Sequence, residues 1–556
     1  MRNTLRLVSV LGPLFCLLAA PATAAEQAHS TPVATPARAP LFDDLGDHHH
    51  PITTRSKLAQ RYFDQGLRLV YAFNHDEAVR SFSEAARLDP DCAMAYWGIA
   101  LARGPNINLP MDQAAERAAY EAAQKALSLR PHASEAERAY IEALARRYSL
   151  DQGADRRALQ LAYADAMREV ARRHPRDDDA ATLFAEALMD LRPWDLWQKN
   201  GEPQPGTLEI LTTLEAVLRR NPDHPGANHY YIHAVEASPH PERGLASAER
   251  LGKLMPGAGH IVHMPSHIYA RVGRYDDAAE VNARAIAVDR KYIQEFNVGG
   301  FYAMMYYPHN IHFRWSALVA EGRSADALGA ADDLARVVPI DTFREMPAFE
   351  MLAATRLFTL VRFARWQEVL AEPAPPADFK LATAMWHYGR GLALCGTNRL
   401  DEASGEAGRL ATVAAGIPAD RGAMNNTAGQ LLDIATALLD ARIAAGRGDR
   451  ETAIRRLQAA VELQDALGYN EPPDWYYPVR QSLGSQLLAA GRPGDAEAVY
   501  RADLQRNPEN GWSLFGLAES LRSSGDPDKR EAARDVDARL ARAWARADVK
   551  PADVRP

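Results

Sequence analysis

The chain has 556 residues, a formal net charge of −8, 24% charged residues and 47% hydrophobic residues. These values are ordinary for a folded soluble protein, and the length suits either several domains or one elongated repeat array. The negative net charge argues against nucleic acid and anionic membrane surfaces as partners, because both favour basic proteins.

The first 24 residues are typical of a secretory signal peptide. Arg2 and Arg6 precede the apolar run LVSVLGPLFCLLAAPA, and Ala22–Ala24 offers a small-residue cleavage site. Cys16 lies inside this run without the small neighbours that a lipoprotein site needs. No later segment approaches about 18 uninterrupted apolar residues, so we expect no membrane span. We therefore predict a periplasmic or secreted protein.

Residues 25–55 are rich in Ala, Pro and Thr and end in GDHHHPITT. This composition predicts a flexible lead before the folded part of the chain. Its tract His48–His50 is a weak candidate for metal binding, because short histidine-rich tracts are found in metal sites.

From about Ser56 onward, helices of roughly 12–15 residues follow one another with short breaks. Alanine is abundant and β-branched residues never dominate a long run, which favours an all-α chain. In the first helix pair, Gly66 allows close approach and Phe82 fills the space between helices. The second helix of this pair also carries Ala78 and Ala85 and ends at Pro90. The same pattern returns at Gly273, Ala278 and Ala285, and again at Gly484, Ala496, Tyr500 and Pro508.

This spacing resembles the tetratricopeptide repeat (TPR) family, in its exported bacterial type, whose unit is a helix–turn–helix of 34 residues. The resemblance extends over most of residues 56–525 and implies an all-α, right-handed α-solenoid superhelix. It also implies that the first helix of each pair lines a concave groove, where a peptide or protein partner would bind. The expected parts are a signal peptide (1–24), the lead (25–55), an N-terminal array (56–340) with a histidine-rich concave patch (225–316), a C-terminal array (341–548) and a tail (549–556).

Histidines are concentrated in that patch. Eight of the 17 histidines lie between residues 229 and 312. Repeat starts at Pro225 and Gly259 are 34 residues apart, and a third start at Pro308 follows after a 15-residue insertion. Relative to these starts, seven histidines occupy only three equivalent positions: His260 and His309 at one, His229, His263 and His312 at four, and His233 and His267 at eight residues after the start.

Offsets of three, four and seven residues fall on one face of a helix. The equivalent positions of the first repeat hold Phe63 and Leu67, so the histidines are not a general feature of the scaffold. Pro265 complicates the pattern, because proline breaks or kinks a helix interior. We expect the helix either to begin near His263 or to kink there, which leaves His260 the least certain in position.

Two imidazoles four residues apart on one helix face can chelate a single metal ion. We therefore predict a metal site formed by His229, His233, His260, His263, His267, His309 and His312. Nitrogen-only ligation suits a divalent transition metal, with zinc and copper favoured, and seven ligands are enough for two ions. Glu236 shares the face of His229 and is expected to be a ligand, an orienting partner or a general base. The insertion 293–307 is expected to fold over the patch as a lid.

Three functions remain open at this point. The first is a metal-dependent protein, such as an oxidase or a hydrolase, with the groove as its substrate pocket. The second is a metal-free scaffold that binds peptides or proteins, and the third is metal storage or delivery. A histidine ladder without metal would instead bind an anionic or aromatic partner or respond to pH. No phosphate-binding loop, nucleophile elbow or HExxH motif is present in the sequence.

Overall fold

A computed structural model describes residues 38–151 and 153–554. The predicted signal peptide lies outside the described residues. The described residues from Ala39 onward form one compact unit. None of the described helices is both long enough and apolar enough to cross a membrane.

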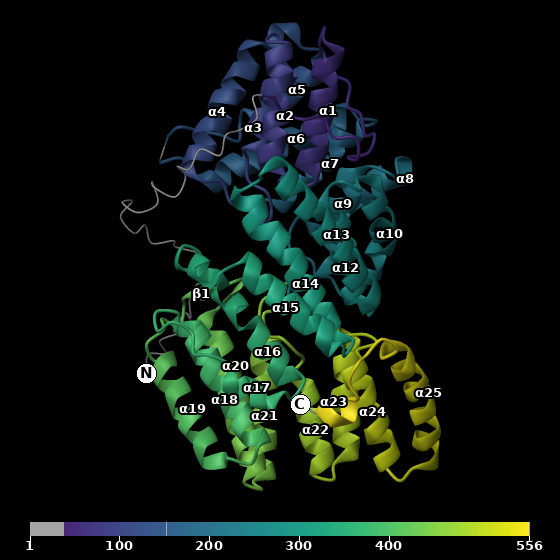
Figure 1. Ribbon diagram of the computed structural model, residues 1–556. Helices are drawn as coiled ribbons and strands as arrows, with labels where there is room; N and C mark the ends of the chain where they lie inside the picture. The colour runs from purple at the N-terminus through teal and green to yellow at the C-terminus, as the bar shows by residue number, and fades with distance from the viewer. Residues whose placement is uncertain (1–37, 152, 555–556) are drawn as a thin grey trace, which may run out of the picture. The chain divides into compact units, whose positions relative to one another are not determined.

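The described unit is built almost entirely of helices (Figure 1). The first α-helices are α1 (Lys57–Tyr71), α2 (His75–Leu88), α3 (Ala93–Ala102), α4 (Gln113–Ser128), α5 (Glu135–Leu144), α6 (Arg156–Arg173), α7 (Asp178–Met189) and α8 (Thr207–Arg220). The middle ones are α9 (Pro225–Glu236), α10 (Leu245–Leu254), α11 (Gly259–His263), α12 (Pro265–Arg271), α13 (Tyr275–Phe296), α14 (Tyr307–Ala320) and α15 (Ser324–Val337).

The C-terminal half continues in the same way. Its α-helices are α16 (Thr355–Arg362), α17 (Trp366–Ala371), α18 (Lys380–Gly396), α19 (Leu400–Ala414), α20 (Ala428–Gly446), α21 (Arg450–Asp465), α22 (Arg480–Ala489), α23 (Pro493–Arg506), α24 (Gly511–Ser523) and α25 (Pro527–Ala543). Short helical turns are η1 (Arg130–His132), η2 (Pro241–Gly244), η3 (Tyr302–Tyr306, a π-helix), η4 (Ile340–Arg344), η5 (Pro347–Ala354) and η6 (Pro551–Val554). The strands β1 (Gly422–Ala423) and β2 (Asn426–Thr427) form a small antiparallel hairpin.

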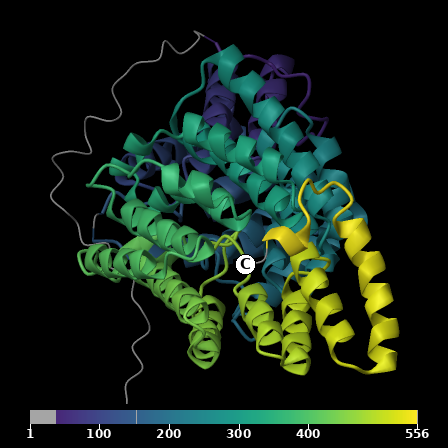
Figure 2. The same cartoon turned by 60° about the horizontal axis from the view of Figure 1, so that its bottom comes forward.

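Consecutive helices pack as pairs, and the pairs stack side by side, most visibly from α18 to α25 (Figure 2). The predicted small and aromatic residues explain this stacking. A Cβ placed on Gly66 of α1 or on Gly98 of α3 would lie 2.6 Å or 2.5 Å from the Phe82 ring, so both first helices close on that ring. Tyr500 of α23 lies in the same way between Gly484 and Gly516. The prediction of an all-α helical repeat solenoid is therefore confirmed.

Residues 39–55, which the sequence analysis assigned to a flexible lead, pack against the helices. The Tyr62 hydroxyl donates to the carbonyl of Ala39, and the Gln65 amide donates to the carbonyl of Pro40. Leu45 is 3% exposed. Because these contacts bury both apolar and polar groups of the segment, residues 39–55 belong to the folded unit.

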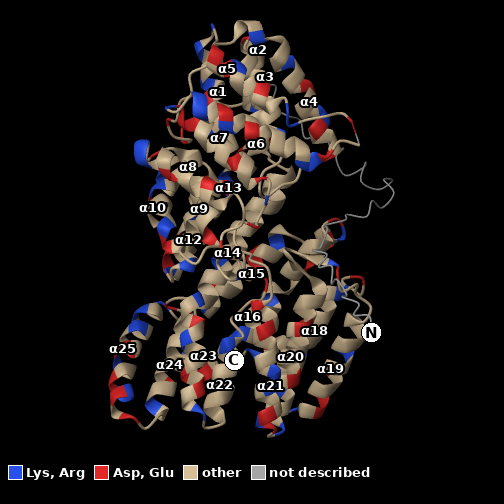
Figure 3. Ribbon diagram, turned by 180° about the vertical axis from the view of Figure 1, so that it is seen from behind, with Lys and Arg blue, Asp and Glu red and all other residues tan. Residues whose placement is uncertain are grey.

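Charged side chains of both signs are mixed along the helices of the described unit (Figure 3). Many of them form ion pairs within one helix, such as Arg399 with Glu402 and Arg365 with Glu368. Exposed pairs of this kind contribute about 0–1 kcal/mol each, so they add little to the stability of the fold.

Candidate metal centre

The seven histidines predicted from repeat spacing lie on neighbouring helices. His229 and His233 are on α9, His260 and His263 on α11, His267 on α12, and His309 and His312 on α14. Met264 separates α11 from α12 but keeps helical backbone angles (φ −51°, ψ −35°), and Pro265 is the first residue of α12. This interruption of the helix is the irregularity expected from Pro265.

Six of the imidazoles gather in two groups of three. The first triad is His229, His233 and His260, and the second triad is His263, His267 and His309. Within each triad, the three possible ligand atoms lie within 4.8 Å of one another. The triads are adjacent, because the ring centroids of His233 and His267 are 5.7 Å apart, as are those of His260 and His263. His260 thus joins the imidazoles of the preceding repeat.

His312, the seventh predicted ligand, belongs to neither triad. Its ring stacks on Trp315, with ring centroids 5.1 Å apart and an interplanar angle of 9°. Burial lowers the pKa of His312 to about 4. The side chain therefore packs as a neutral aromatic ring against Trp315 of its own helix.

The triads are buried instead of lining an open groove. Five of the six imidazoles, all but His309, are at most 5% exposed. Phe73, which follows α1, stacks against His233 and His260, with ring centroids 5.9 Å and 5.5 Å away. The ring centroids of Tyr306 and His260 are 4.5 Å apart, so the insertion 293–307, which was expected to act as a lid, contributes a side chain to the cover. The repeat spacing could not reveal this cover, because Phe73 comes from a distant repeat.

In the first triad, the hydrogen bonds leave ring nitrogens free. His229 Nδ1 lies 2.6 Å from the carbonyl oxygen of Tyr71, and His233 Nδ1 lies 2.7 Å from Glu236 Oε1. Both partners only accept, so each Nδ1 carries the proton and each Nε2 keeps its lone pair. Neither Nε2 has a hydrogen-bond partner among the described residues, and the same holds for both ring nitrogens of His260.

In the second triad, two lone pairs face each other. His263 Nδ1 lies 2.7 Å from Asn282 Oδ1, whose orientation is fixed because Asn282 Nδ2 donates to the carbonyl of Ala278. His267 Nδ1 bonds to Glu236 Oε2. With both Nδ1 atoms donating, the Nε2 atoms of His263 and His267 lie 2.8 Å apart. Two lone pairs at this distance repel unless a cation, either a proton or a metal ion, lies between them.

Glu236 connects the triads. Its Oε1 accepts from His233 in the first triad and its Oε2 accepts from His267 in the second. Burial alone would raise the pKa of Glu236, but His267 and His233 outweigh it and lower the pKa to about 2. The carboxylate therefore stays ionised and fixes one imidazole of each triad. Of the three roles predicted for Glu236, its contacts correspond to the orienting one.

The imidazoles are held in the form that binds metals. Burial, followed by the neighbouring imidazoles, lowers the pKa values of His229, His260 and His263 well below the usual range. His267 is the exception: burial opposes its protonation, but Glu236 raises its pKa. Neutral imidazoles present a lone pair, so the site favours metal ligation over a cluster of positive charges.

Three partners of the triads were not found by the sequence analysis: the Tyr71 carbonyl, the Phe73 ring and the Asn282 amide. Tyr71 and Phe73 lie more than 150 residues before His229, and a backbone carbonyl leaves no mark in the sequence. Asn282 lies on α13, the second helix of the pair, whereas the histidine pattern follows first helices.

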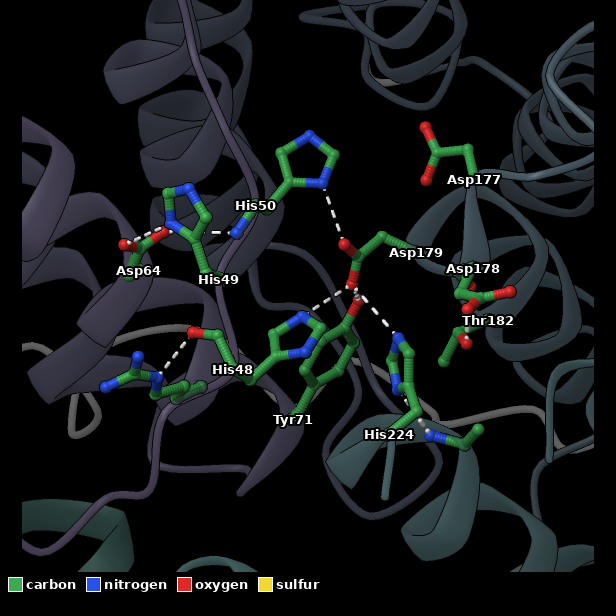
Figure 4. A network of polar contacts seen from close by, with 12 residues as sticks. His48, His49, His50, Asp64, Tyr71, Asp177, Asp178, Asp179, Thr182 and His224 are labelled. Atoms are coloured by element: carbon green, nitrogen blue, oxygen red, sulfur yellow. Dashed lines mark hydrogen bonds and ion pairs between the residues drawn. The ribbon is translucent and has the colours of Figure 1, made fainter. Parts of the chain in front are cut away.

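A second histidine cluster surrounds Asp179 in the first turn of α7 (Figure 4). The Oδ1 atom lies 2.9 Å from His48 Nε2, 3.1 Å from His224 Nε2 and 2.5 Å from the Tyr71 hydroxyl. The Oδ2 atom lies 2.7 Å from His50 Nδ1. Asp179 thus connects the segment before α1 to the repeat array.

The hydrogen bonds of His224 show which of its ring nitrogens carries the proton, and they indicate a hydrogen-bond network around Asp179. The backbone N–H of Ala227 donates to His224 Nδ1 at 3.1 Å, so His224 carries its proton on Nε2. A protonated Nε2 donates to Asp179 and cannot bind a metal ion. Burial alone would raise the pKa of Asp179, but the surrounding imidazoles lower it well below the usual range. The tautomer of His224 argues against an ion shared by His48, Asp179 and His224. His50, Asp177 and Asp179 also lie close enough to share an ion, so the weak prediction of a metal site at His48–His50 stays a prediction.

The H50Q variant should reveal a pH-dependent contribution to stability. Burial opposes protonation of His50, yet the hydrogen bond to Asp179 raises its pKa above the usual 6.5. Because the pKa of His50 is higher in the folded state than in the unfolded state, its protonation stabilises the folded protein fully below pH 6.5. This stabilisation is lost as the pH rises through the pKa of His50 in the folded state. We expect H50Q to lower the free energy of unfolding by about 1–3 kcal/mol at pH 6, and by less at pH 8.5. Urea unfolding at both pH values measures the difference, and an equal loss at both would contradict this account.

Comparisons with known proteins give only distant likenesses. No protein-family model and no curated protein matches the sequence. Among solved structures, the chain is similar to yeast Tom70 (TM-score 0.29, 11% identity, 89% of this chain and 91% of that chain). It is also similar to human IFIT1 solved as a dimer with PPP-AAAA (TM-score 0.31, 13% identity, 88% and 92%). A third is the Cut9–Hcn1 hetero-tetramer of the APC/C (TM-score 0.30, 13% identity, 89% and 75%).

Proposed function

We propose that this protein is an exported metal-binding protein that holds two transition-metal ions, one in each histidine triad. The observation that carries the proposal is the facing pair of Nε2 atoms of His263 and His267, 2.8 Å apart, with both Nδ1 protons directed elsewhere. In the first triad, the Nε2 atoms of His229, His233 and His260 also have no hydrogen-bond partner among the described residues. Metal-bound histidines commonly donate their other N–H to a carbonyl or carboxylate.

Charge balance favours copper in its monovalent state. An imidazole that binds a metal ion through one nitrogen and keeps its proton on the other is neutral, so the six ligands would add no charge, and Glu236 is the one carboxylate bonded directly to them in the described chain. Two divalent ions would leave three net positive charges in a buried site, whereas two Cu(I) ions leave one. Uncompensated charge in the protein interior costs several kcal/mol per ion. Zinc is the second choice, because imidazole also suits Zn²⁺.

Burial favours metal holding over the conversion of an organic substrate. Five of the six imidazoles are at most 5% exposed, and aromatic rings such as Phe73 and Phe313 cover them. The Phe73 and Phe313 rings keep an organic molecule away from the faces of the imidazoles that they cover. Storage or delivery of the metal therefore agrees best with the site. The alternative of a metal-free scaffold for proteins is consistent with the helical repeat fold alone.

Elemental analysis of the mature protein, purified without a histidine tag, tests the proposal. We expect about two copper ions per chain after anaerobic incubation with excess Cu(I) and gel filtration. Competition between copper and zinc at equal concentration tests the choice of metal. A chain that emerges with no bound ion under both conditions would disprove metal binding and leave the metal-free scaffold as the function.

The E236Q variant tests the orienting carboxylate. Glutamine has nearly the same shape, but its neutral oxygen is a weaker acceptor, and its NH₂ group would face one of the two protonated Nδ1 atoms. Loss of such a partner typically lowers metal affinity 10–100-fold. We expect this weakening at both triads, measured by competition with a copper chelator. E242Q is the matched control, because Glu242 lies on the surface beside His240. Weakening of one ion only would contradict the shared role of Glu236.

A further inference from the structure

A cavity in the C-terminal half of the chain lies far along the sequence from both histidine clusters. It is bounded by α16, α17, α18, α20, α21 and α22 and by the segment that precedes α22. Its volume is about 60 Å³, which is room for roughly four to six water molecules at 10–15 Å³ each. Residues at its wall that bear on its chemistry are Arg362, Arg442, Tyr388, Tyr476, Tyr477 and Ser482.

Arg362, at the end of α16, is 4% exposed. Its Nη2 atom donates to Gln481 Oε1, and its Nε and Nη1 atoms have no hydrogen-bond partner among the described residues. The guanidinium lies between two rings, 3.6 Å from the Trp512 centroid and 4.9 Å from that of Tyr477. The rings compensate part of the charge through cation–π attraction. No carboxylate within the described ranges forms an ion pair with it, and burial lowers its pKa to about 10.

The charge of the cavity wall is positive. Arg442 of α20, which has an interaction of its own, also lines the cavity, and the wall contains no Asp or Glu in the described part of the chain. The buried charge of Arg362 is the one with open donors, and buried positive charge is normally paired with an anion or with a full set of acceptors. A guanidinium binds planar carboxylates particularly well, because its N–H groups match the geometry of the two oxygens.

The rest of the wall is aromatic and apolar. Tyr476 stacks on Phe358 with ring centroids 4.3 Å apart, and its hydroxyl lies 3.0 Å from that of Tyr388. Trp366 and Leu392 also line the cavity. Such a wall packs against the apolar body of a ligand, while tyrosine hydroxyls can donate to an anionic end. A fully hydrated inorganic anion would gain little from these rings.

We propose that this cavity binds a small organic carboxylate, with the anionic end at the open Nε and Nη1 donors of Arg362, on the side of the wall that Arg442 also lines, and the apolar body against the tyrosines. The site is independent of the two histidine triads and requires no metal ion. It gives the protein a second ligand of a different chemical class.

Isothermal titration calorimetry on the full mature chain tests the cavity, with benzoate, its neutral analogue benzamide and inorganic phosphate as probes. We expect benzoate to bind at least tenfold more tightly than benzamide and than phosphate. This comparison uses the unmodified protein, so it does not depend on whether a variant folds. Equal binding of benzoate and benzamide would overturn the role of charge. Tighter binding of phosphate would overturn the choice of an organic carboxylate, and no binding of any probe would overturn the site.

The R442Q variant tests whether benzoate binds in this cavity. Arg442 is only half buried, so glutamine should be tolerated at this position. Loss of one charged contact should weaken benzoate binding about 10–100-fold. R399Q is the control, since Arg399 lies on the surface of the same half and pairs with Glu402. Copper content should be two ions per chain in both variants. Unchanged benzoate affinity in R442Q would place the binding elsewhere and refute the proposal.

Discussion

Replacing His263 and His267 together with phenylalanine should reduce the bound metal from two ions to one. The substitution removes the two facing Nε2 atoms and leaves His309 as the remaining imidazole of the second triad. One imidazole cannot hold an ion against competing chelators, because affinity depends on several ligands binding together. Phenylalanine fills nearly the same volume and adds no buried polar atom. Elemental analysis after gel filtration measures the metal content per chain.

The reciprocal variant, H229F/H233F, should also retain one ion, held by the second triad. Combining all four substitutions should abolish binding. H132F serves as the control, because His132 is exposed and lies in η1, outside both triads. If H263F/H267F retains two ions with unchanged affinity, the ions are bound elsewhere. If it loses both while H229F/H233F loses neither, the protein has a single site and the pairing of triads is wrong.

The D179N variant should be destabilised by about 3–5 kcal/mol, the cost of breaking a buried ionic network on one side. Asp179 accepts from three imidazoles and one tyrosine hydroxyl. Asparagine keeps one acceptor oxygen but presents an NH₂ group to side chains that also donate. It also removes a negative charge at the N-terminal end of α7, where the helix dipole favours an anion. Urea unfolding at pH 7 measures the change.

D178N provides the matched control, since Asp178 precedes Asp179 on α7 and pairs with Arg220 near the surface. A partly exposed ion pair contributes about 0–1 kcal/mol, so D178N should remain close to the parent protein. Tyr71 links Asp179 to the first triad, because its hydroxyl donates to Asp179 and its carbonyl accepts from His229. D179N should therefore also weaken metal binding at the first triad more than at the second. Equal stability of D179N and the parent would show that the Asp179 network does not hold the residues before α1 in place.

Repeat spacing alone placed the seven candidate histidines in register. The offsets from Pro225, Gly259 and Pro308 predicted three neighbouring first helices, and the side chains do lie on α9, α11, α12 and α14. This works because a helical repeat array converts sequence register directly into spatial register. The same reasoning predicted close helix contact at Gly66, where the Phe82 ring leaves no room for a Cβ atom.

Register did not determine the direction of each side chain or its surroundings. By spacing, His309 is equivalent to His260 of the first triad, yet it joins the second triad. His312 is equivalent to His229 and His263, yet it stacks on Trp315. The cover over the triads comes partly from Phe73 and Trp194, which belong to other repeats. Long-range contacts of this kind depend on how distant repeats meet, and the local period carries no information about that.

The sequence by itself determined the helical repeat fold and the concentration of imidazoles in one region, because both follow from a period that local residues encode. Only the tertiary structure decided that the imidazoles form two buried triads, that Glu236 joins them and that Asp179 holds the residues before α1. These features depend on which ring nitrogen meets a proton acceptor. That choice is made by groups far apart in the chain, such as the Tyr71 carbonyl opposite His229.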